Sequence, residues 1–231
     1  MSRVRKQEEY NAKKNRIVMM SIDLLDEIGY EHFSVNKVIA NAGMTKGAFF
    51  HYFKSKNELI EEIVNIILLP MAAALEEIVS DKTLLPKQKI LNMADSVNKI
   101  KSTHKRTAQQ LVKLLQKEEN KNMAHMVTEK TIEMFLPMYE KVLIEGNELG
   151  QFNIEYPNGS AFIYFNVLAS INKEIGAVMR SDIIDKKRYF KLREKVSAFE
   201  AYAQNLFNFD NEIKVIDEKL WNIDLKRLSN D

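Results

Sequence analysis

The sequence contains no cysteine. Disulfide bonds, thiolate nucleophiles and cysteine-ligated metal or iron–sulfur centres are therefore excluded. A chain without disulfides fits a reducing compartment. The first residues are polar and basic, without the apolar core of a signal peptide. We therefore expect a cytoplasmic protein.

Long apolar runs are also missing. The longest one, from Ile63 to Leu75, is interrupted by Asn65 and Pro70. It is shorter than the roughly 20 residues that a membrane-spanning helix needs. We therefore expect no interaction with a membrane.

Glycine and proline are scarce, at seven and four residues among 231. Few turns are therefore available, and alternating patterns of β-branched and aromatic residues are hard to find. Leu, Ile, Met, Glu and Lys are abundant, and these residues favour helices. The composition predicts an all-α protein with an ordinary globular balance of 45% hydrophobic and 29% charged residues.

The net charge is only +2, but it is unevenly distributed. Residues 1–56 hold ten Lys and Arg against six Asp and Glu, a net charge of +4, which leaves −2 for residues 57–231. Either the N-terminal region attracts a polyanion, or the asymmetry is a chance feature of a solvated surface.

Three helices are predicted in this basic region. The first covers residues 9–28, has one apolar stripe and ends at Gly29. Ser34 is a suitable N-cap for a second helix over 35–42, which Gly43 ends. Thr45 then caps a third helix that continues to residue 53. Two short helices joined by a glycine-containing turn form a helix-turn-helix pattern.

The third helix has two distinct faces. Phe49, Tyr52 and Phe53 have the spacing of an inward face, and the opposite face carries Lys46, Gly47, Phe50, His51 and Lys54. In a DNA major groove, lysines can donate to phosphates or guanine, a glycine permits close approach, and a phenylalanine can contact thymine methyl groups. Alternatively, Phe50 and His51 pack against a neighbouring domain.

A fourth helix opens with a capping box, Ser55-Lys56-Asn57-Glu58. The amides at its N-terminus, with Lys56 beside them, form a potential phosphate site. We expect this helix to bend at Pro70 and to end near Ser80.

The run GMTKGAFFHYFKSKNEL, residues 43–59, resembles the signature of the TetR (tetracycline-repressor) family. Upstream, Gly29-Tyr30, Phe33-Ser34-Val35 and Ile39-Ala40 also resemble the family pattern, so the similarity covers about residues 10–60. Phe49 and Phe50 replace the more usual Leu and Tyr. The missing hydroxyl at residue 50 removes one potential hydrogen bond to DNA.

The resemblance implies a homodimer that binds a pseudo-palindromic DNA operator and is released by a small effector in its second domain. It assigns DNA contacts to Ser34, Thr45, Lys46, Gly47, Phe50, His51, Tyr52 and Lys56, although the spacing turns Tyr52 inward. Arg3, Arg5 and Lys6 either reach the DNA or belong to a disordered tail, and we favour the tail.

The remaining sequence predicts a larger helical domain. We assign residues 1–56 to the DNA-binding domain and 57–231 to an effector-binding and dimerisation domain. A break at 146–157 resembles the passage before the eighth helix in many family members. The predicted helices cover residues 87–102, 106–119, 121–148, 160–180, 186–207 and 211–228, the last with the single Trp221.

The predicted helix 160–180 is apolar over much of its circumference. It needs cover on two sides, either from its own domain and a second subunit in a four-helix bundle, or from a monomer that buries it completely.

Methionine and aromatic residues of the central helices are candidates for lining an effector pocket, and eleven methionines suit an apolar, variable ligand. The same residues would serve equally as ordinary core. The candidates are Met71, Leu75, Met93, Leu111, Leu115, Met123, Met126, Met134, Phe135, Tyr139, Phe162 and Phe165.

No enzyme motif is present: the sequence lacks a nucleophile elbow, a phosphate-binding loop, a dinucleotide fingerprint and a zinc-protease motif. We expect no catalytic residues and no cofactor. His104 and His125 have no partner at metal-ligand spacing, so no metal site is expected either. One alternative remains, a DNA-bound adaptor whose second domain docks a protein instead of a small molecule.

Overall fold

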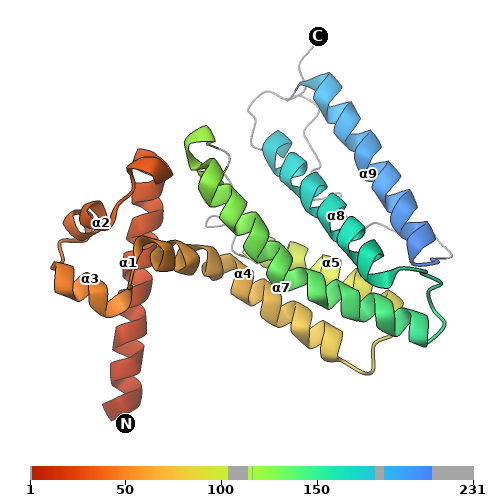
Figure 1. Ribbon diagram of the computed structural model, residues 1–231, viewed down its shortest axis with the longest axis horizontal. Helices are drawn as coiled ribbons and strands as arrows, with labels where there is room; N and C mark the ends of the chain where they lie inside the picture. The colour runs from red at the N-terminus through yellow and green to blue at the C-terminus, as the bar shows by residue number, and fades with distance from the viewer. Residues whose placement is uncertain (1, 104–113, 116, 180–184, 210–231) are drawn as a thin grey trace. The chain divides into compact units, whose positions relative to one another are not determined.

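The computed structural model describes residues 2–103, 114–115, 117–179 and 185–209, which contain helices and no strand (Figure 1). The all-α prediction is confirmed. The elements are α1 (Ser2–His32), α2 (Val35–Ala42), α3 (Lys46–Tyr52), α4 (Lys56–Ser80), α5 (Pro86–Thr103), the 3-10 helix η1 (Glu118–Asn120), α7 (Lys121–Glu148), α8 (Pro157–Met179) and α9 (Lys186–Leu206).

The chain divides into two compact units. The first combines residues up to Leu69 with the segment from 104 to Thr128, and the second holds residues 70–103 and 129 onward. Both α4 and α7 therefore contribute to each unit. The start of α7 contacts the end of α1, although the functional division predicted after residue 56 would place it in the other domain.

The first unit has a core shared by α1, α2, α3 and the start of α4. Its buried side chains are Ile17, Val18, Ile22, Leu25, Phe33, Val38, Phe49, Phe53, Leu59, Ile60 and Ile63. Burial of these apolar groups is the main force that holds the short helices, because seven- and eight-residue helices are unstable alone. Gly29 has φ of 74° and interrupts α1, which confirms the predicted end of the first helix.

The prediction of a disordered N-terminal tail is wrong, because α1 already begins at Ser2. Two side-chain pairs at i, i+4 spacing support this early start. The guanidinium of Arg5 lies 3.3 Å from the carboxylate of Glu9, and Gln7 donates to Asn11 over 3.1 Å. Such pairs each add a few tenths of a kcal/mol, roughly 0.2–0.5, to helix stability.

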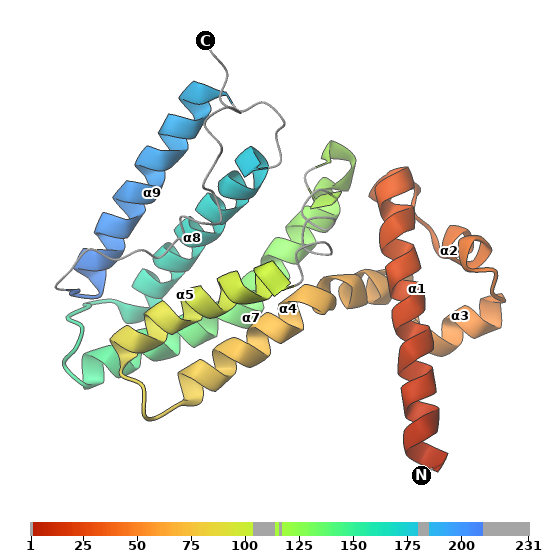
Figure 2. The same ribbon diagram turned by 180° about the vertical axis from the view of Figure 1, so that it is seen from behind.

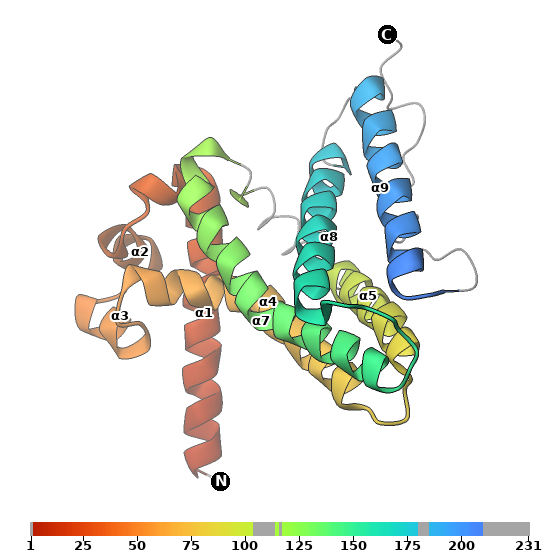
Figure 3. The same cartoon turned by 45° about the vertical axis from the view of Figure 1, so that its right-hand side comes forward.

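In the second unit, α8 lies alongside α9, and the two helices run in opposite directions (Figures 2 and 3). Aromatic rings of α7, α8 and α9 and of the residues that follow α9 pack against one another in tilted and edge-to-face arrangements. The ring centroid of Tyr164 lies 5.1 Å from that of Phe199 and 4.9 Å from that of Phe207, and Tyr139 lies 5.4 Å from Phe165. Burial raises the pKa of both Tyr139 and Tyr164.

A buried lysine holds the helices of this unit together. The ammonium of Lys89 donates to the carbonyl of Val79, at the end of α4, over 2.9 Å. It also lies 2.8 Å from the carboxylate of Glu145 on α7. The charge of Lys89 is thus balanced inside the protein, as burial of an ammonium group requires.

The predicted break after α7 is confirmed. Gly150 has φ of 67°, and the side chain of Asn147 exchanges two hydrogen bonds with the backbone of Ile154, at 2.6 and 3.0 Å. The start predicted for the next helix is wrong by three residues, since α8 begins at Pro157. Proline suits the first position of a helix, where its missing N–H leaves no partner unsatisfied.

Within the described ranges, no single helix is long and apolar enough to cross a membrane. The two halves of α4, Lys56–Ile66 and Leu68–Ser80, meet that criterion only as a bent pair. Most of the predicted helix 106–119, the predicted helix 211–228 with Trp221, and His104 lie outside the described residues.

Candidate nucleic-acid interface

Side-chain caps fix the start of both helices of the helix-turn-helix. The hydroxyl of Ser34 accepts from the amide of Lys37 over 3.4 Å, and that of Thr45 accepts from Ala48 over 3.1 Å. Between them Gly43 has φ of 59° in the left-handed region, and the amide of Met44 donates to the carbonyl of Ile39. These contacts confirm the predicted caps and the sharp turn.

The two predicted faces of α3 are also observed. Phe49 and Phe53 are fully buried, whereas Lys46, Gly47 and His51 are exposed. Phe50 leaves 45% of its surface exposed. An exposed aromatic ring between cationic and small residues can contact the floor of a major groove while the lysine reaches phosphate or guanine.

Tyr52, predicted to face inward, is half-buried. It packs against Tyr10 of α1, with ring centroids 4.9 Å apart. Tyr10 was not predicted to take part in this surface. The signal was present, because Tyr10 lies seven residues before Ile17 and so continues the buried stripe of α1 by two turns.

The start of α4 shows the predicted capping box with one change. The hydroxyl of Ser55 accepts from the amide of Glu58 over 3.1 Å. The carboxylate of Glu58 accepts from the amide of Lys54, one residue before the position that the motif usually satisfies. The first turn of α4 is therefore fixed directly after α3.

The side chain of Lys56 bends toward the end of α1. Its ammonium donates to the carbonyl of Tyr30 over 2.8 Å and lies 4.0 Å from the centroid of the Tyr30 ring. Desolvation lowers the pKa of Lys56. The contact with Tyr30 uses one of the three N–H donors of the ammonium, and the predicted phosphate contact of Lys56 stays a prediction.

Tyr30 also contacts the segment around the start of α7. Its amide donates to the side-chain oxygen of Asn120, and its hydroxyl lies 3.8 Å from the sulfur of Met126. Nearby, the ammonium of Lys117 lies 3.0 Å from the carboxylate of Asp26. Met126, predicted to line an effector pocket, thus contacts the end of α1.

Residues 18–63 match the family described as bacterial regulatory proteins of the tetR family. This range contains both caps, the turn, α3 and the start of α4. This part of the chain therefore belongs to the TetR family.

Two curated relatives match the same region of the chain. They are the uncharacterized HTH-type transcriptional regulator YvdT of Bacillus subtilis, 33% identical over 58 residues, and the HTH-type transcriptional regulator BetI of Vibrio campbellii, 29% identical over 65 residues. The matches cover 25% and 28% of this chain. The chain spans about a third of the length of these relatives, 30% and 33%.

Solved structures extend the likeness in fold beyond that region. The SmeT–triclosan complex aligns with a TM-score of 0.65 at 18% identity, over 89% of this chain and 98% of the other. Native NalD, the secondary repressor of the MexAB-OprM multidrug efflux pump in Pseudomonas aeruginosa, aligns with a TM-score of 0.64 at 16% identity, over 86% and 99%. At these identities the alignments show a shared fold.

Most of the predicted effector-contacting residues are buried. Phe162, in contrast, leaves 51% of its surface exposed. Leu115, Met126 and Met134 are half-buried, and Leu111 lies outside the described residues. The buried candidates are Met71, Leu75, Met93, Met123, Phe135, Tyr139 and Phe165.

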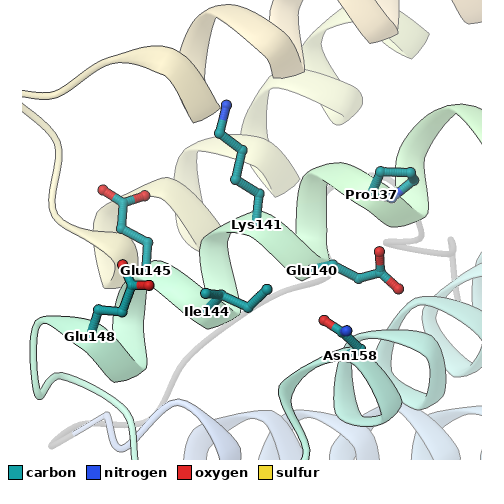
Figure 4. Close-up of a pocket in the computed structure, with 7 residues that line it drawn as sticks. All are labelled: Pro137, Glu140, Lys141, Ile144, Glu145, Glu148 and Asn158. Carbon is teal, nitrogen blue, oxygen red and sulfur yellow. The ribbon is translucent and has the colours of Figure 1, made fainter.

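An open pocket of about 490 Å³ lies elsewhere, along one face of α7 beside the first turn of α8 (Figure 4). It contains none of the predicted effector-contacting residues. Three carboxylates give it an acidic lining, and one of them, that of Glu145, is engaged by Lys89. The lining residues are Pro137, Glu140, Lys141, Ile144, Glu145, Glu148 and Asn158. In the part of the chain that the structure describes, no cluster of three potential ligands could hold a metal ion.

Proposed function

We propose that this protein is a TetR-family repressor that binds a pseudo-palindromic operator as a homodimer. A small, apolar effector bound in its C-terminal domain releases it from the DNA. The exposed face of α3, with Lys46, Gly47, Phe50 and His51, is the observation that carries this proposal.

In this account α3 of each subunit enters a major groove, and the two helices lie about 35 Å apart, one turn of DNA. Lys46 and His51 donate to phosphates or base edges, and Phe50 contacts thymine methyl groups. Ser34, Thr45 and Tyr52 contact the phosphate backbone at the edges of the groove. Lys56 offers its remaining N–H donors to a phosphate at the start of α4.

The apolar outer face of α8 supports the homodimer. Phe162, Ile163 and Val167 are exposed large side chains that lie on one side of the helix. Phe190 and Tyr202 add exposed aromatic surface on the neighbouring α9. A second copy of α8 and α9, related by a two-fold axis, would cover this surface in a four-helix bundle.

The C-terminal domain supports an apolar effector through its methionine and aromatic interior. SmeT, which shares the fold, was solved with triclosan, and NalD is named as a repressor of a multidrug efflux pump. An effector that prefers the DNA-free form by about 3 kcal/mol would weaken operator binding roughly a hundredfold.

The salt dependence of DNA affinity tests the role of α3. We expect Lys46→Ala to weaken binding to a fluorescent mixed-sequence duplex and to reduce the slope of log affinity against log salt by about 2 per dimer. Lys82→Ala, which removes a lysine exposed in the loop after α4, is the matched control and should leave the slope unchanged. An unchanged slope for Lys46→Ala would remove Lys46 from the DNA contacts.

Light scattering of surface variants tests the dimer. Ile163→Glu combined with Val167→Glu places charges in the proposed interface and should give a folded monomer. Leu149→Glu alters an equally exposed leucine in the turn after α7 and should leave the dimer intact. A dimer that survives the paired substitution would exclude α8 as the interface.

A further inference from the structure

Tyr30 joins three segments of the first unit that are distant in sequence. It belongs to α1, directly after the interruption at Gly29. Its carbonyl accepts from Lys56 at the start of α4, over 2.8 Å. Its amide donates to Asn120, 90 residues away, and its hydroxyl contacts Met126 on α7.

Asn120 has a defined orientation in this arrangement. Its side chain is completely buried, with 0% of its surface exposed. The amide oxygen accepts from Tyr30, and the amide nitrogen donates to the carbonyl of Leu114 over 2.8 Å. Because both ends of the buried amide are satisfied, a rotation of this side chain would leave polar groups without partners.

Both groups that hold Lys56 belong to Tyr30. The ammonium contacts the Tyr30 carbonyl and lies over the Tyr30 ring. The peptide unit of Tyr30 is fixed from the other side by Asn120, and its ring hydroxyl contacts Met126. A displacement of the segment 114–126 would therefore move both the carbonyl and the ring away from Lys56.

We propose that Asn120 is a positioning residue for DNA binding. Through Tyr30 it holds the ammonium of Lys56 at the start of α4, ready for a backbone phosphate, so that movement of residues 114–126 changes DNA affinity. This inference rests on the proposed function, since it gives Lys56 a phosphate partner.

The physical basis is ordering of Lys56 before DNA arrives. A free lysine side chain loses rotamer freedom when it binds a phosphate, and that loss opposes binding. A side chain already held by Tyr30 has lost this freedom, and two of its three N–H donors are still available for the phosphate. Loss of the contact between Asn120 and Tyr30 should therefore weaken DNA binding.

A second contact between α1 and the segment 114–126 provides a matched control. Lys117 contacts both the carboxylate and the carbonyl of Asp26, one turn before Tyr30. Lys117→Ala therefore weakens the attachment of the segment 114–126 to α1 without removing a contact of Tyr30. Asn120→Ala removes the contact with Tyr30 itself.

The first test needs no DNA. In ¹³C-lysine-labelled protein, the Cε protons of Lys56 should resonate upfield of those of other lysines, because the ammonium lies over the Tyr30 ring. We expect Asn120→Ala to abolish this upfield shift and Lys117→Ala to retain it. If Asn120→Ala does not fold, Asn120→Ser keeps a polar group but cannot reach both partners. A Lys56 shift that is unchanged in the folded Asn120 variant would overturn the proposal.

The second test is a double-mutant cycle on duplex affinity. We expect Asn120→Ala to weaken DNA binding about fivefold in the parent protein and to have no further effect when Lys56 is replaced by methionine. Any loss of DNA affinity caused by Lys117→Ala should be the same whether residue 56 is lysine or methionine. Equal losses from Asn120→Ala in both backgrounds, or a gain in affinity, would overturn the proposal.

The two tests separate this inference from the proposed function. If the parent protein shows no salt-dependent DNA binding, the proposed function fails, and the role of Asn120 in DNA binding fails with it. If the parent protein binds DNA but the Lys56 chemical shift is the same in the Asn120 variant, only the link through Tyr30 is wrong.

Discussion

The hydroxyl of Tyr10 donates a hydrogen bond to the backbone carbonyl of His51, with 3.4 Å between the two oxygens. The ring of Tyr10 also meets that of His51 edge to face, at 5.4 Å between centroids. The last carbonyls of a helix have no partner within it, so α1 supports α3 where α3 needs external contacts. The exposed face of α3 is thereby held on a longer helix.

Replacement of Tyr10 should separate packing from hydrogen bonding. Tyr10→Ala removes the ring that supports His51 and Tyr52, so we expect a loss of about 1–2 kcal/mol in the free energy of unfolding and weaker DNA binding. Tyr10→Phe removes one long hydrogen bond and should cost less than about 1 kcal/mol. Urea unfolding and duplex titration check both. A Phe variant as impaired as the Ala variant would assign the main contribution to the hydroxyl.

Gly47 should matter for DNA and not for folding. A Cβ at this helical position would meet no atom within 4 Å, so Gly47→Ala should stabilise the free protein by about 0.5–1 kcal/mol. The same methyl group would hold the α3 backbone away from the groove, so DNA affinity should fall. Thermal unfolding and duplex titration of the same preparation measure the two effects. Unchanged affinity would place Gly47 outside the DNA contact.

Gly146 should tolerate no side chain. A Cβ there would lie 1.9 Å from Cδ2 of the buried Phe152 ring. The ring must move, and we expect Gly146→Ala to lower the free energy of unfolding by about 1–3 kcal/mol. Gly159→Ala is the matched control, because its nearest neighbour would be 3.8 Å away, and it should be neutral or stabilising. Equal stabilities in urea would contradict the packing described here.

Buried phenols predict unfolding at alkaline pH. Burial raises the pKa of Tyr139 and Tyr164 above their value in the unfolded chain, so the folded state keeps protons that the unfolded state releases. Their contribution to stability is present below about pH 10 and is lost as the pH rises further. Tyr139→Phe and Tyr164→Phe should therefore show a smaller loss of stability between about pH 8 and pH 11. An identical loss in both variants would contradict this origin.

The helix-turn-helix could be predicted because its signals are local. Ser34 and Thr45 cap the helix that follows each of them, and Gly43 adopts the conformation that glycine allows most easily. The spacing of Phe49 and Phe53 alone identifies the buried face of α3. Each of these inferences needs only three or four neighbouring residues.

Contacts between distant segments could not be predicted in the same way. Nothing near Tyr30 in the sequence indicates that Asn120 accepts from its amide, since 90 residues separate them. Phe162 and Phe165 are both apolar residues of α8, yet only Phe165 is buried, because neighbours in space decide which side of an apolar helix is covered. The helical conformation of the N-terminus was not predicted, for another reason. Its polar composition resembles that of a disordered tail, but weak side-chain pairs at i, i+4 spacing favour the helix and outweigh it.

The most direct test of the central claim is selection of DNA by the purified protein from random or genomic fragments, at about 150 mM salt, with sequencing of the retained pool. The account predicts enrichment of one palindromic sequence whose half-sites lie about one helical turn apart, and loss of that enrichment with Lys46→Ala. Protein from which bound small molecules have been removed by unfolding and refolding should retain the same sequence. No enrichment by such ligand-free protein would contradict operator recognition by α3.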